Sequence, residues 1–530
     1  MLTRRNGLKA GLATGALLLG RAGEAAAQAN RDAVTILVRN DSVGFDPHKV
    51  TGRGAAEILF MITDTLVTVE DDQKTVHPLL AKSWTISPDG TTYTFELRDD
   101  VTFHNGKPFT AEDVVYSLSR LVDPQTRSPA AWRAGSVRSI TAKGPHTVEY
   151  VLERPYNELL LQLAQSFGAI IDKANVEAMG NDFGARGLNG TGPFRWGEWR
   201  PRDRFVLERN DAYRWGPVIY ENRGPARVRQ VIWQVIPEES AIVAAIQTGG
   251  DITYVAPEWA VEGLKRDPRL SVTEPRVSNY SAFLGLRTNR ELTSDMRVRQ
   301  AMSLSINREE LVKSLWFGQA GVGNSYINPG TLDYSEAGKV SYDRARANAL
   351  LDEAGWVRGA DGIRVKDGKR LSPEIVAANT PGWRARLGAI QGYMRAVGID
   401  LRLMMPEPAA AMLRINTSPD YDSYALFQPY GTAGEALMPF HSRNIPAPNR
   451  VNWRDAETDA LMDAGQVALT EAARAEAYGK VQRIVAEKAL VIPLAHEKLF
   501  LFVNRRLSDV KVHGIYNCGV YKGLDMRVGR

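Results

Sequence analysis

Alternating apolar and polar residues in the first half of the chain predict a region rich in β-strands. After the turn at Asp89-Gly90, the apolar residues Tyr93, Phe95 and Leu97 alternate with polar ones, which is the pattern of a half-buried strand. We expect further strands at residues 34–39, 147–152 and 228–235. Short helices and many Gly and Pro turns separate them.

An amphipathic helix is predicted to follow the strand at 93–97. Val114, Leu118 and Leu121 recur at the spacing that places them on one helix face. Thr110 stands three residues before Asp113, so its hydroxyl can cap the helix while the carboxylate favours the N-terminal end of the dipole. Strand and helix together indicate a small unit of mixed α and β structure.

The second half of the chain is richer in predicted helix. Strand-like residues 374–378 and 399–404 enclose an amphipathic helix at 384–397, which Gly398 ends in a position suited to positive φ. A strand–helix–strand order of this kind implies an α/β lobe. Asn307 and Ser341 are expected to cap further helices, and Thr470 to open a long one.

The first 29 residues predict a cleavable export signal, because basic residues precede an apolar run at 10–20 and small residues at 25–29. The run is shorter than the about 20 residues that a membrane span needs. Residues 3–9 also resemble a twin-arginine motif, with Gly7 where a large apolar residue is usual, so the twin-arginine route is favoured and the general secretory route stays open. The single cysteine, Cys518, excludes an N-terminal lipid anchor and an internal disulfide after processing. We therefore expect a soluble periplasmic protein, and a monomer.

Net charge argues against nucleic acid or an anionic membrane surface as a partner. The formal charge of +5 falls to +2 once residues 1–29, with four basic residues and one acidic residue, are removed. The remaining charges are scattered along the chain. About 500 mature residues exceed what one hydrophobic core usually serves, so two or three domains are expected.

A search for catalytic and metal-binding motifs finds none that fits. The chain has no GxSxG, and His496-Glu497 lacks the second histidine of a zinc protease helix. Residues 362–369 depart from a phosphate-binding loop and are better interpreted as a hairpin that turns at Asp367-Gly368. The seven histidines are dispersed without metal-ligand spacing. We predict no catalytic residue, no metal and no cofactor, and therefore not an enzyme.

Several longer segments carry a family resemblance that spans almost the whole chain after the signal. These segments are FDPH (45–48), HPLLAKSWTISPDGTTYTFELRDDVTFHNGKPFTAEDVVYSLSRL (77–121), GTGPFRWGEW (190–199), LERNDAYRW (207–215), DMRVRQAMSLSINREELVKSLWFGQA (295–320) and IPLAHE (492–497). They resemble the extracytoplasmic solute-binding proteins of ABC importers, in the family with dipeptide-, oligopeptide- and nickel-binding members.

The resemblance implies an α/β, two-lobed periplasmic binding protein fold of type II, similar to cluster C. Lobe I would comprise residues 30–280 plus 500–530, with an extra subdomain at 77–186, and lobe II residues 281–499. The chain would cross between lobes near 280–285 and near 499–503, which makes a two-segment hinge with the solute between the lobes. It also implies a receptor that captures a peptide or peptide-like solute and delivers it to a membrane permease.

By position relative to the family, the expected ligand-binding residues lie on loops at the edges of the lobes. They are Ser42, Phe45, Trp132, Asn279, Tyr280, Trp383, Gln428 and Tyr430. Phe45 would equally fit a core residue, and Trp383 a residue that staples the start of a helix. His441 matches the loop in which some nickel-binding relatives place a histidine, although its sequence context is that of a solvated loop residue.

The two charged anchors that dipeptide-binding relatives use are missing from the matching positions. Tyr430 stands where those relatives have an aspartate for the peptide amino terminus, and residues 377–383 contain no arginine for its carboxylate. Glu435 could replace the amine anchor. The solute class therefore stays open between a peptide and an oligosaccharide, an opine, glutathione or a metal chelate. Two rivals from other classes are a periplasmic peptide or glycan hydrolase and a scaffold or chaperone.

Overall fold

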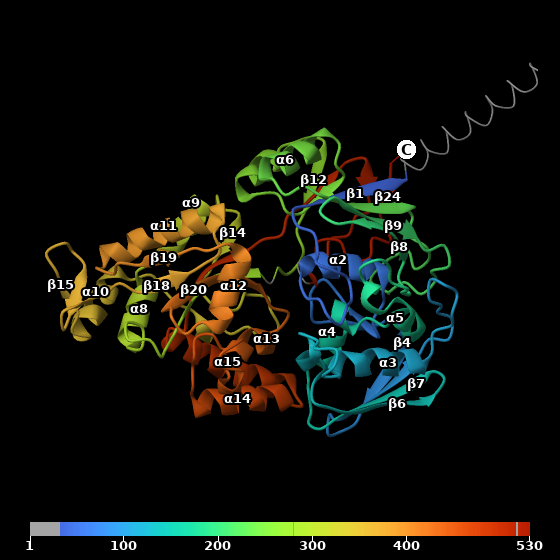
Figure 1. The fold of residues 1–530 in the computed structure, drawn as a ribbon, viewed down its shortest axis with the longest axis horizontal. Coiled ribbons are helices and arrows are strands. Elements are labelled where there is room, and N and C mark those ends of the chain that lie inside the picture. Colours follow the sequence, from blue (N-terminus) through green and yellow to red (C-terminus); the bar gives the residue numbers. More distant parts are fainter. Residues whose placement is uncertain (1–31, 279, 516–517, 530) are drawn as a thin grey trace, which may run out of the picture.

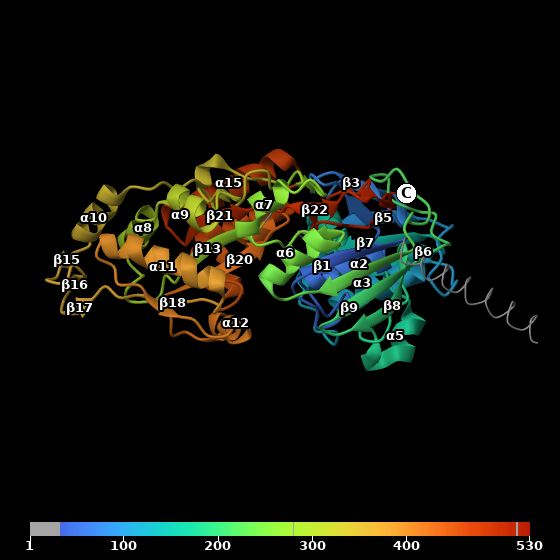
Figure 2. The same ribbon diagram turned by 90° about the horizontal axis from the view of Figure 1, so that it is seen from above.

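The computed structural model describes residues 32–278, 280–515 and 518–529, which form two α/β lobes side by side (Figure 1). Lobe I, drawn in blue and green, is built around a seven-stranded sheet, and lobe II, drawn mainly in yellow and orange, around a six-stranded sheet. Seen from above, the lobes lie end to end (Figure 2). The predicted two-lobed α/β fold is confirmed.

The sheet of lobe I joins strands from both ends of the chain. Its strands, in spatial order, are β12 (Leu270–Thr273), β22 (Leu501–Asn504), β11 (Ile252–Thr253), β1 (Ala33–Val38), β10 (Gln230–Val235), β9 (Arg204–Arg209) and β8 (Phe194–Arg200). Alternate residues of β1 face different cores, because Ile36 packs with helix α2 (Arg53–Ile62) and Leu37 with α6 (Glu239–Thr248) and α7 (Val261–Lys265). Helices therefore cover both faces of this sheet.

The subdomain of lobe I contains the strand and the helix that the alternating pattern predicts. Its sheet consists of β4 (Ala81–Ile86), β5 (Thr92–Leu97), β7 (Thr147–Leu152) and β6 (Val137–Gly144), and helix α3 (Ala111–Val122) packs on it. Tyr93, Phe95 and Leu97 are buried as expected. Thr110 and Asp113 form the predicted capping box of α3.

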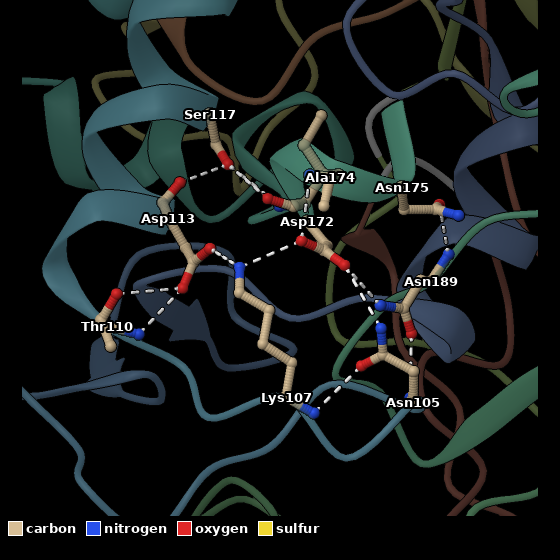
Figure 3. A network of polar contacts seen from close by, with 10 residues as sticks. Asn105, Lys107, Thr110, Asp113, Ser117, Asp172, Ala174, Asn175 and Asn189 are labelled. Atoms are coloured by element: carbon tan, nitrogen blue, oxygen red, sulfur yellow. Dashed lines mark hydrogen bonds and ion pairs between the residues drawn. The ribbon is translucent and has the colours of Figure 1, made fainter. Parts of the chain in front are cut away.

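A polar network fastens the loop before α3 to the rest of lobe I (Figure 3). The Lys107 ammonium group pairs with the carboxylate of Asp113 on α3. It also lies 3.0 Å from the carboxylate of Asp172, which caps α5 (Lys173–Met179). Asn189 Nδ2 donates a hydrogen bond of 2.9 Å to the same Asp172 carboxylate. Because both carboxylates are buried, their pairing with Lys107 joins α3 to the start of α5 within the subdomain, and Asn189 extends the network beyond residue 186.

Lobe II is a second sheet with helices on both faces. Its strands, in spatial order, are β14 (Ala320–Val322), β21 (Val491–Glu497), β13 (Tyr280–Leu286), β20 (Ser423–Pro429), β18 (Glu374–Val376) and β19 (Arg402–Met404). Helices α8 (Met296–Leu304), α9 (Arg308–Leu315), α10 (Arg344–Glu353) and α11 (Pro381–Ala396) contribute to the core on one face. Helices α13 (Ala433–Leu437), α14 (Ala456–Val467) and α15 (Glu471–Glu487) contribute to the core on the other.

The predicted strand–helix–strand unit of lobe II is present, with shorter strands and an earlier start of the helix than expected. Strands β18 and β19 pair in parallel, with α11 between them in sequence, and Gly398 has the expected positive φ of 90°. The helix begins at Pro381 and not at Arg384, because the Thr380 hydroxyl accepts a hydrogen bond from the Trp383 amide and proline is tolerated in a first helical turn. Asn307 caps α9 as predicted, whereas Asp343 and not Ser341 caps α10.

The chain changes sheets between β12 and β13 and again between β21 and β22. These changes lie near the two crossings expected from the sequence, although the exact lobe boundaries stay a prediction. The signal peptide expected at 1–29 lies outside the described residues. No helix in the described part of the chain is long and apolar enough to cross a membrane.

Candidate functional site

The two lobes touch in two separate zones, and charged groups dominate the first. Lobe I contributes η4 (Glu258–Ala260) and α7, and lobe II contributes α11 and the turn before β14. The Arg386 guanidinium of α11 pairs with the Glu258 carboxylate across the boundary. Gln319 joins α7 at two points, since its Oε1 accepts from Lys265 at 3.0 Å and its Nε2 donates to Glu262 at 3.1 Å.

The second zone lies between the subdomain and helices α13 to α15. Arg133 of η1 (Ala131–Ala134) pairs with Glu435 of α13, and both side chains are almost buried. Asn157 Nδ2 donates to the carbonyl groups of Gly465 and Ala468 at 2.8 and 3.0 Å. Both zones are polar and could separate at moderate cost, as expected of lobes that open and close.

A third group of side chains faces the start of β13 from lobe I. Arg53, on the first turn of α2, pairs with Glu57 at 3.4 Å, and its guanidinium carbon lies 5.4 Å from the ring centre of Tyr254. Its charge also acts on Tyr280 and Glu497 of lobe II. Arg53 keeps 37% of its side chain exposed, whereas Glu57 beside it is buried.

Aromatic rings of lobe II surround the Arg386 guanidinium. Its central carbon lies 4.2 Å from the ring centre of Trp316 and 5.2 Å from that of Phe427, which are cation–π distances. Trp383 lies 4.7 Å from Phe427 between ring centres, and Tyr280 is stacked on Phe427 at 5.7 Å. The group combines flat apolar surfaces with one buried cation, an arrangement typical of small-solute sites.

Glu497 ends strand β21 next to this aromatic group. The Trp316 Nε1 donates to its carboxylate at 3.4 Å. Burial raises the pKa of Glu497 to about 7, with a further increase from Glu258, although Arg386 and Arg53 act in the opposite direction. Near neutral pH the Glu497 carboxyl therefore exists in both protonation states, so it can donate or accept a hydrogen bond.

Replacing Glu497 with glutamine is expected to change the pH dependence of stability. Between its ordinary pKa of 4.5 and its raised pKa of about 7, Glu497 binds a proton in the folded protein that the unfolded chain releases. Its contribution to stability is full below about pH 4.5 and is lost as the pH rises through about 7. Urea unfolding should therefore show Glu497→Gln gaining stability over the wild type from about pH 5 to about pH 8. An equal difference in stability between the variant and the wild type at about pH 5 and at about pH 8 would contradict this expectation.

The structure brings several of the predicted site residues to the boundary between lobes. Tyr280 and Trp383 contact the same ring, that of Phe427. Trp132 is 38% exposed and lines a cavity between the subdomain and lobe II. Ser42 lies within lobe I, where its backbone is near Gly54 on the first turn of α2. Their contact with a solute stays a prediction.

The other four predicted site residues, Phe45, Asn279, Gln428 and Tyr430, either do not join the group around Phe427 or lie outside the described residues. Gln428 is half-buried on β20, next to Phe427 in sequence and therefore on the opposite face of the sheet, where its register partner is Ser281. Asn279 lies outside the described residues. Tyr430 lies in the lobe II core, as described next.

Phe45 and Tyr430 lie in hydrophobic cores, which is against their predicted contact with ligand. Phe45 is 1% exposed and makes edge contacts with aromatic rings, the nearest being Phe205 at 4.8 Å. Tyr430 is 5% exposed, and its hydroxyl bonds to that of Tyr326. The reason is that β20 ends at Pro429 and the next side chain turns into the lobe II core.

His441 also differs from its expected solvated position. It is 5% exposed, and its ring nitrogens lie 3.3 Å from Asp459 and 3.5 Å from Asp463. Among the residues that the structure describes, no group of three or more His, Cys, Asp or Glu side chains could hold a metal ion.

Sequence reasoning missed Arg386, Arg53, Glu497 and Trp316. Arg386 had a detectable signal, because it lies one turn after Trp383 and directly before Leu387 on the buried face of α11. An arginine beside an apolar helix stripe needs a buried partner. The other three had no local signal, since their neighbours at this boundary come from distant parts of the chain.

Two α/β lobes that meet over charged and aromatic side chains, with the chain changing lobes twice, define a protein that encloses a solute between its lobes. The chain belongs to family 5 of the bacterial extracellular solute-binding proteins, since the model for the middle part of that family matches residues 75–442.

Relatives with stated ligands match most or all of the chain. Di/tripeptide-binding protein 2 of Pseudomonas aeruginosa is 27% identical over 94% of this chain and 95% of its own. The nickel-binding periplasmic protein of Escherichia coli is 30% identical over 67% of each chain. The solved oligopeptide-binding protein AppA of Bacillus subtilis, in complex with a nonapeptide, has the same fold, with a TM-score of 0.80, 23% identity and coverage of 94% of this chain and 99% of its own.

These findings confirm the receptor function that the sequence resemblance implied. The chain is a solute-binding receptor of the ABC importer type, and the family is one of receptors and not of hydrolases.

Proposed function

We propose that this receptor binds a peptide or peptide-like solute with a free carboxylate group, which Arg386 holds, and delivers it to the permease of an ABC importer. The observation that carries the proposal is the pairing of a buried Arg386 with an acid of the opposite lobe. The protein acts without catalysis. Its expected signal at 1–29 would export it to the periplasm by the twin-arginine route.

Arg386 has more hydrogen-bond donors than partners. Its side chain is 7% exposed, and its Nε finds no acceptor among the described residues. A guanidinium carries five N–H donors in a planar fork that fits a carboxylate with two hydrogen bonds. When the lobes open, Glu258 withdraws with lobe I, and a solute carboxylate would supply the missing negative charge.

The buried positive charge of Arg386 favours solutes that carry a carboxylate over neutral ones. A neutral oligosaccharide would bring no negative charge to Arg386, so the Nε donor that Glu258 leaves free would stay without a charged acceptor. Peptides, opines, glutathione and carboxylate chelates of metals would each pair with it. The names of the di/tripeptide-binding and nonapeptide-bound relatives favour a peptide within this set.

Closure couples binding to delivery. A solute held between the Arg386 group and the Arg53 group binds the closed arrangement better than the open one, because only closure brings both lobes to it. In the closed arrangement opposite charges pair in both contact zones. Arg386 pairs with Glu258 in the first zone, and Arg133 pairs with Glu435 in the second. A permease can thereby distinguish the loaded receptor from the empty one.

A thermal-shift screen with matched peptides tests the proposal. Each peptide is offered with a free and with an amidated carboxyl terminus, next to neutral oligosaccharides of similar mass. Some free-acid peptides should raise Tm by several degrees, because a ligand at 100 times its Kd adds about 2.7 kcal/mol of stability. Their amides should have little effect. Stabilisation by a neutral oligosaccharide, with none by any free acid, would contradict the proposal.

A further inference from the structure

The two zones in which the lobes meet share one arrangement of acids. In each zone, one arginine pairs with one acid of the opposite lobe. That acid, Glu258 in the first zone and Glu435 in the second, also acts on a further carboxyl group across the boundary. The further groups are Glu497 of lobe II and Glu158 of lobe I. Each zone therefore brings two acids from opposite lobes close together when the lobes close.

Glu497 lies where both chain crossings meet lobe II. It ends β21, before the chain returns to lobe I, and its register partner is Tyr280 at the start of β13. Ser278, in the first crossing, donates from its Oγ to the Glu497 carbonyl at 2.7 Å. Burial raises the pKa of Tyr280 to about 12, so its ring stays neutral. A change of charge on Glu497 therefore acts at the point about which the lobes would move.

Charged groups from both lobes act on Glu497. Arg386 and the indole N–H of Trp316 belong to lobe II and stay beside it when the lobes separate. Glu258 and Arg53 belong to lobe I and act on its pKa in opposite directions, with the larger effect from Glu258. Opening would expose Glu497 to water and withdraw the charge of Glu258. Both changes lower the pKa of Glu497 toward its ordinary value.

Glu158 has the corresponding position in the second zone, where it is 2% exposed. Burial raises its pKa to about 7, and a hydrogen bond with Thr432 of lobe II acts in the opposite direction. Glu435 and Asp333 of lobe II raise the pKa further, whereas Arg474, which pairs with Asp333 at 2.6 Å, lowers it. The cause with the largest effect is burial, and closure of the lobes provides part of it.

Opening of the second zone should therefore lower the pKa of Glu158 as well. Water would reach the carboxyl group, and the acids of lobe II would move away from it. Tyr156 and Tyr478 also interact with Glu158, but burial raises the pKa of both phenols and keeps them neutral. In both zones the closed arrangement thus holds a proton more firmly than the open one.

We propose that closure of the lobes takes up protons at Glu497 and Glu158, which makes the two contact zones a pH-dependent switch between the closed and the open receptor. The inference goes beyond the proposed function, because the switch belongs to the lobes themselves and operates without a solute. A mildly acidic periplasm would favour the closed arrangement, and a rise through neutral pH would favour the open one.

The direction of the pH dependence follows from the raised pKa values. Below the pKa of the open arrangement both arrangements hold the proton, and closure has its full strength. As the pH rises through about 7, the closed arrangement must release protons that the open arrangement has already lost. Closure is therefore weakened progressively over this range.

Distance measurements between two spin labels test the switch on the full mature protein without solute. The labels are attached through Val43→Cys in lobe I and Leu413→Cys in lobe II, two side chains that are 95% and 64% exposed. The native Cys518 is buried. We expect the ratio of closed to open receptor to fall about tenfold between pH 6 and pH 8, because a difference of one pKa unit between the two arrangements corresponds to a factor of ten.

Combining Glu158→Gln with Glu497→Gln should remove this pH dependence and keep the receptor closed at pH 8. The reason is that an amide resembles the protonated carboxyl group in shape and lack of charge. Each of the two single variants should retain part of the response, which provides a second measurement if the double variant fails to fold.

The matched control combines Glu177→Gln with Glu476→Gln, which removes one exposed acid from each lobe. It should follow the wild type at every pH. Label distances that do not change with pH, or a response in both single Gln variants equal to that of the control, would overturn the inference. Because no solute is present, such a result would leave the proposed pairing of Arg386 with a solute carboxylate untouched.

Discussion

Arg386→Met is expected to weaken binding of the cognate solute by about 100-fold or more, because losing one member of a buried charged pair costs about 2–5 kcal/mol. Methionine has a similar length, so contact with the rings of Trp316 and Phe427 can persist while the charge disappears. Urea unfolding of the empty variant is measured beside it, since the removed guanidinium pairs with Glu258 of the other lobe and acts on Glu497. Calorimetric titration with the solute found in the peptide screen measures the loss.

Arg384→Met is the matched control for this experiment. Arg384 lies two residues earlier on α11, is exposed, and bonds only to the nearby Asn379 side chain. Its replacement should leave affinity within about twofold of the wild type, because exposed polar contacts contribute little. If Arg386→Met bound the solute as tightly as Arg384→Met does, the carboxylate would have to be held elsewhere.

Lys522→Met is expected to lower the free energy of unfolding by about 3–5 kcal/mol, the usual cost of breaking a buried ion pair. The Lys522 ammonium group lies 2.7 Å from the Asp64 carboxylate, and both side chains are almost completely buried. It also donates to the carbonyl groups of Phe60 and Thr63, at the end of α2. The pair ties the C-terminal segment to lobe I, so its loss leaves a buried carboxylate without a counter-charge.

Lys82→Met provides the control for Lys522. Lys82 pairs with Asp99 at 3.2 Å on the surface of the subdomain, with half or more of each side chain exposed. Exposed pairs contribute about 0–1 kcal/mol, so this variant should unfold almost like the wild type. Urea unfolding of Lys522→Met and Lys82→Met measures the two losses of stability. Similar unfolding midpoints for the two variants would show that the Lys522–Asp64 pair is not needed for stability.

The local elements could be predicted because their signals are local. The alternation at 93–97 and the Thr110–Asp113 capping box involve residues within a few positions of each other, and both appear in the structure. The start of α11 was misplaced because the Thr380 cap and the tolerated Pro381 extend the helix beyond its apolar pattern. Errors of this size are normal at helix ends.

The solute site was harder to predict, because residues far apart in sequence form it. Arg53 acts on Glu497, and Glu258 pairs with Arg386, only after both lobes have folded and closed. Tyr430 is the reverse case, because the sequence places it in the solute site and the structure places it in a core. An aromatic residue on a loop at a lobe edge fits a ligand site and a core equally well, and only packing distinguishes them.

The absence of the family's charged anchors from their usual positions left the solute class open in the sequence interpretation. The structure adds a buried arginine, Arg386, on the helix that follows one of these positions, and the solute class stays a prediction. The predicted replacement of the amine anchor by Glu435 stays open. Glu435 already pairs with Arg133.

Native mass spectrometry of the receptor purified from its own periplasm tests the central claim most directly. The co-purifying molecule is released, fragmented and identified. The account predicts a peptide or peptide-like molecule that carries a free carboxylate, which Arg386 holds. A neutral oligosaccharide as the bound molecule would contradict it.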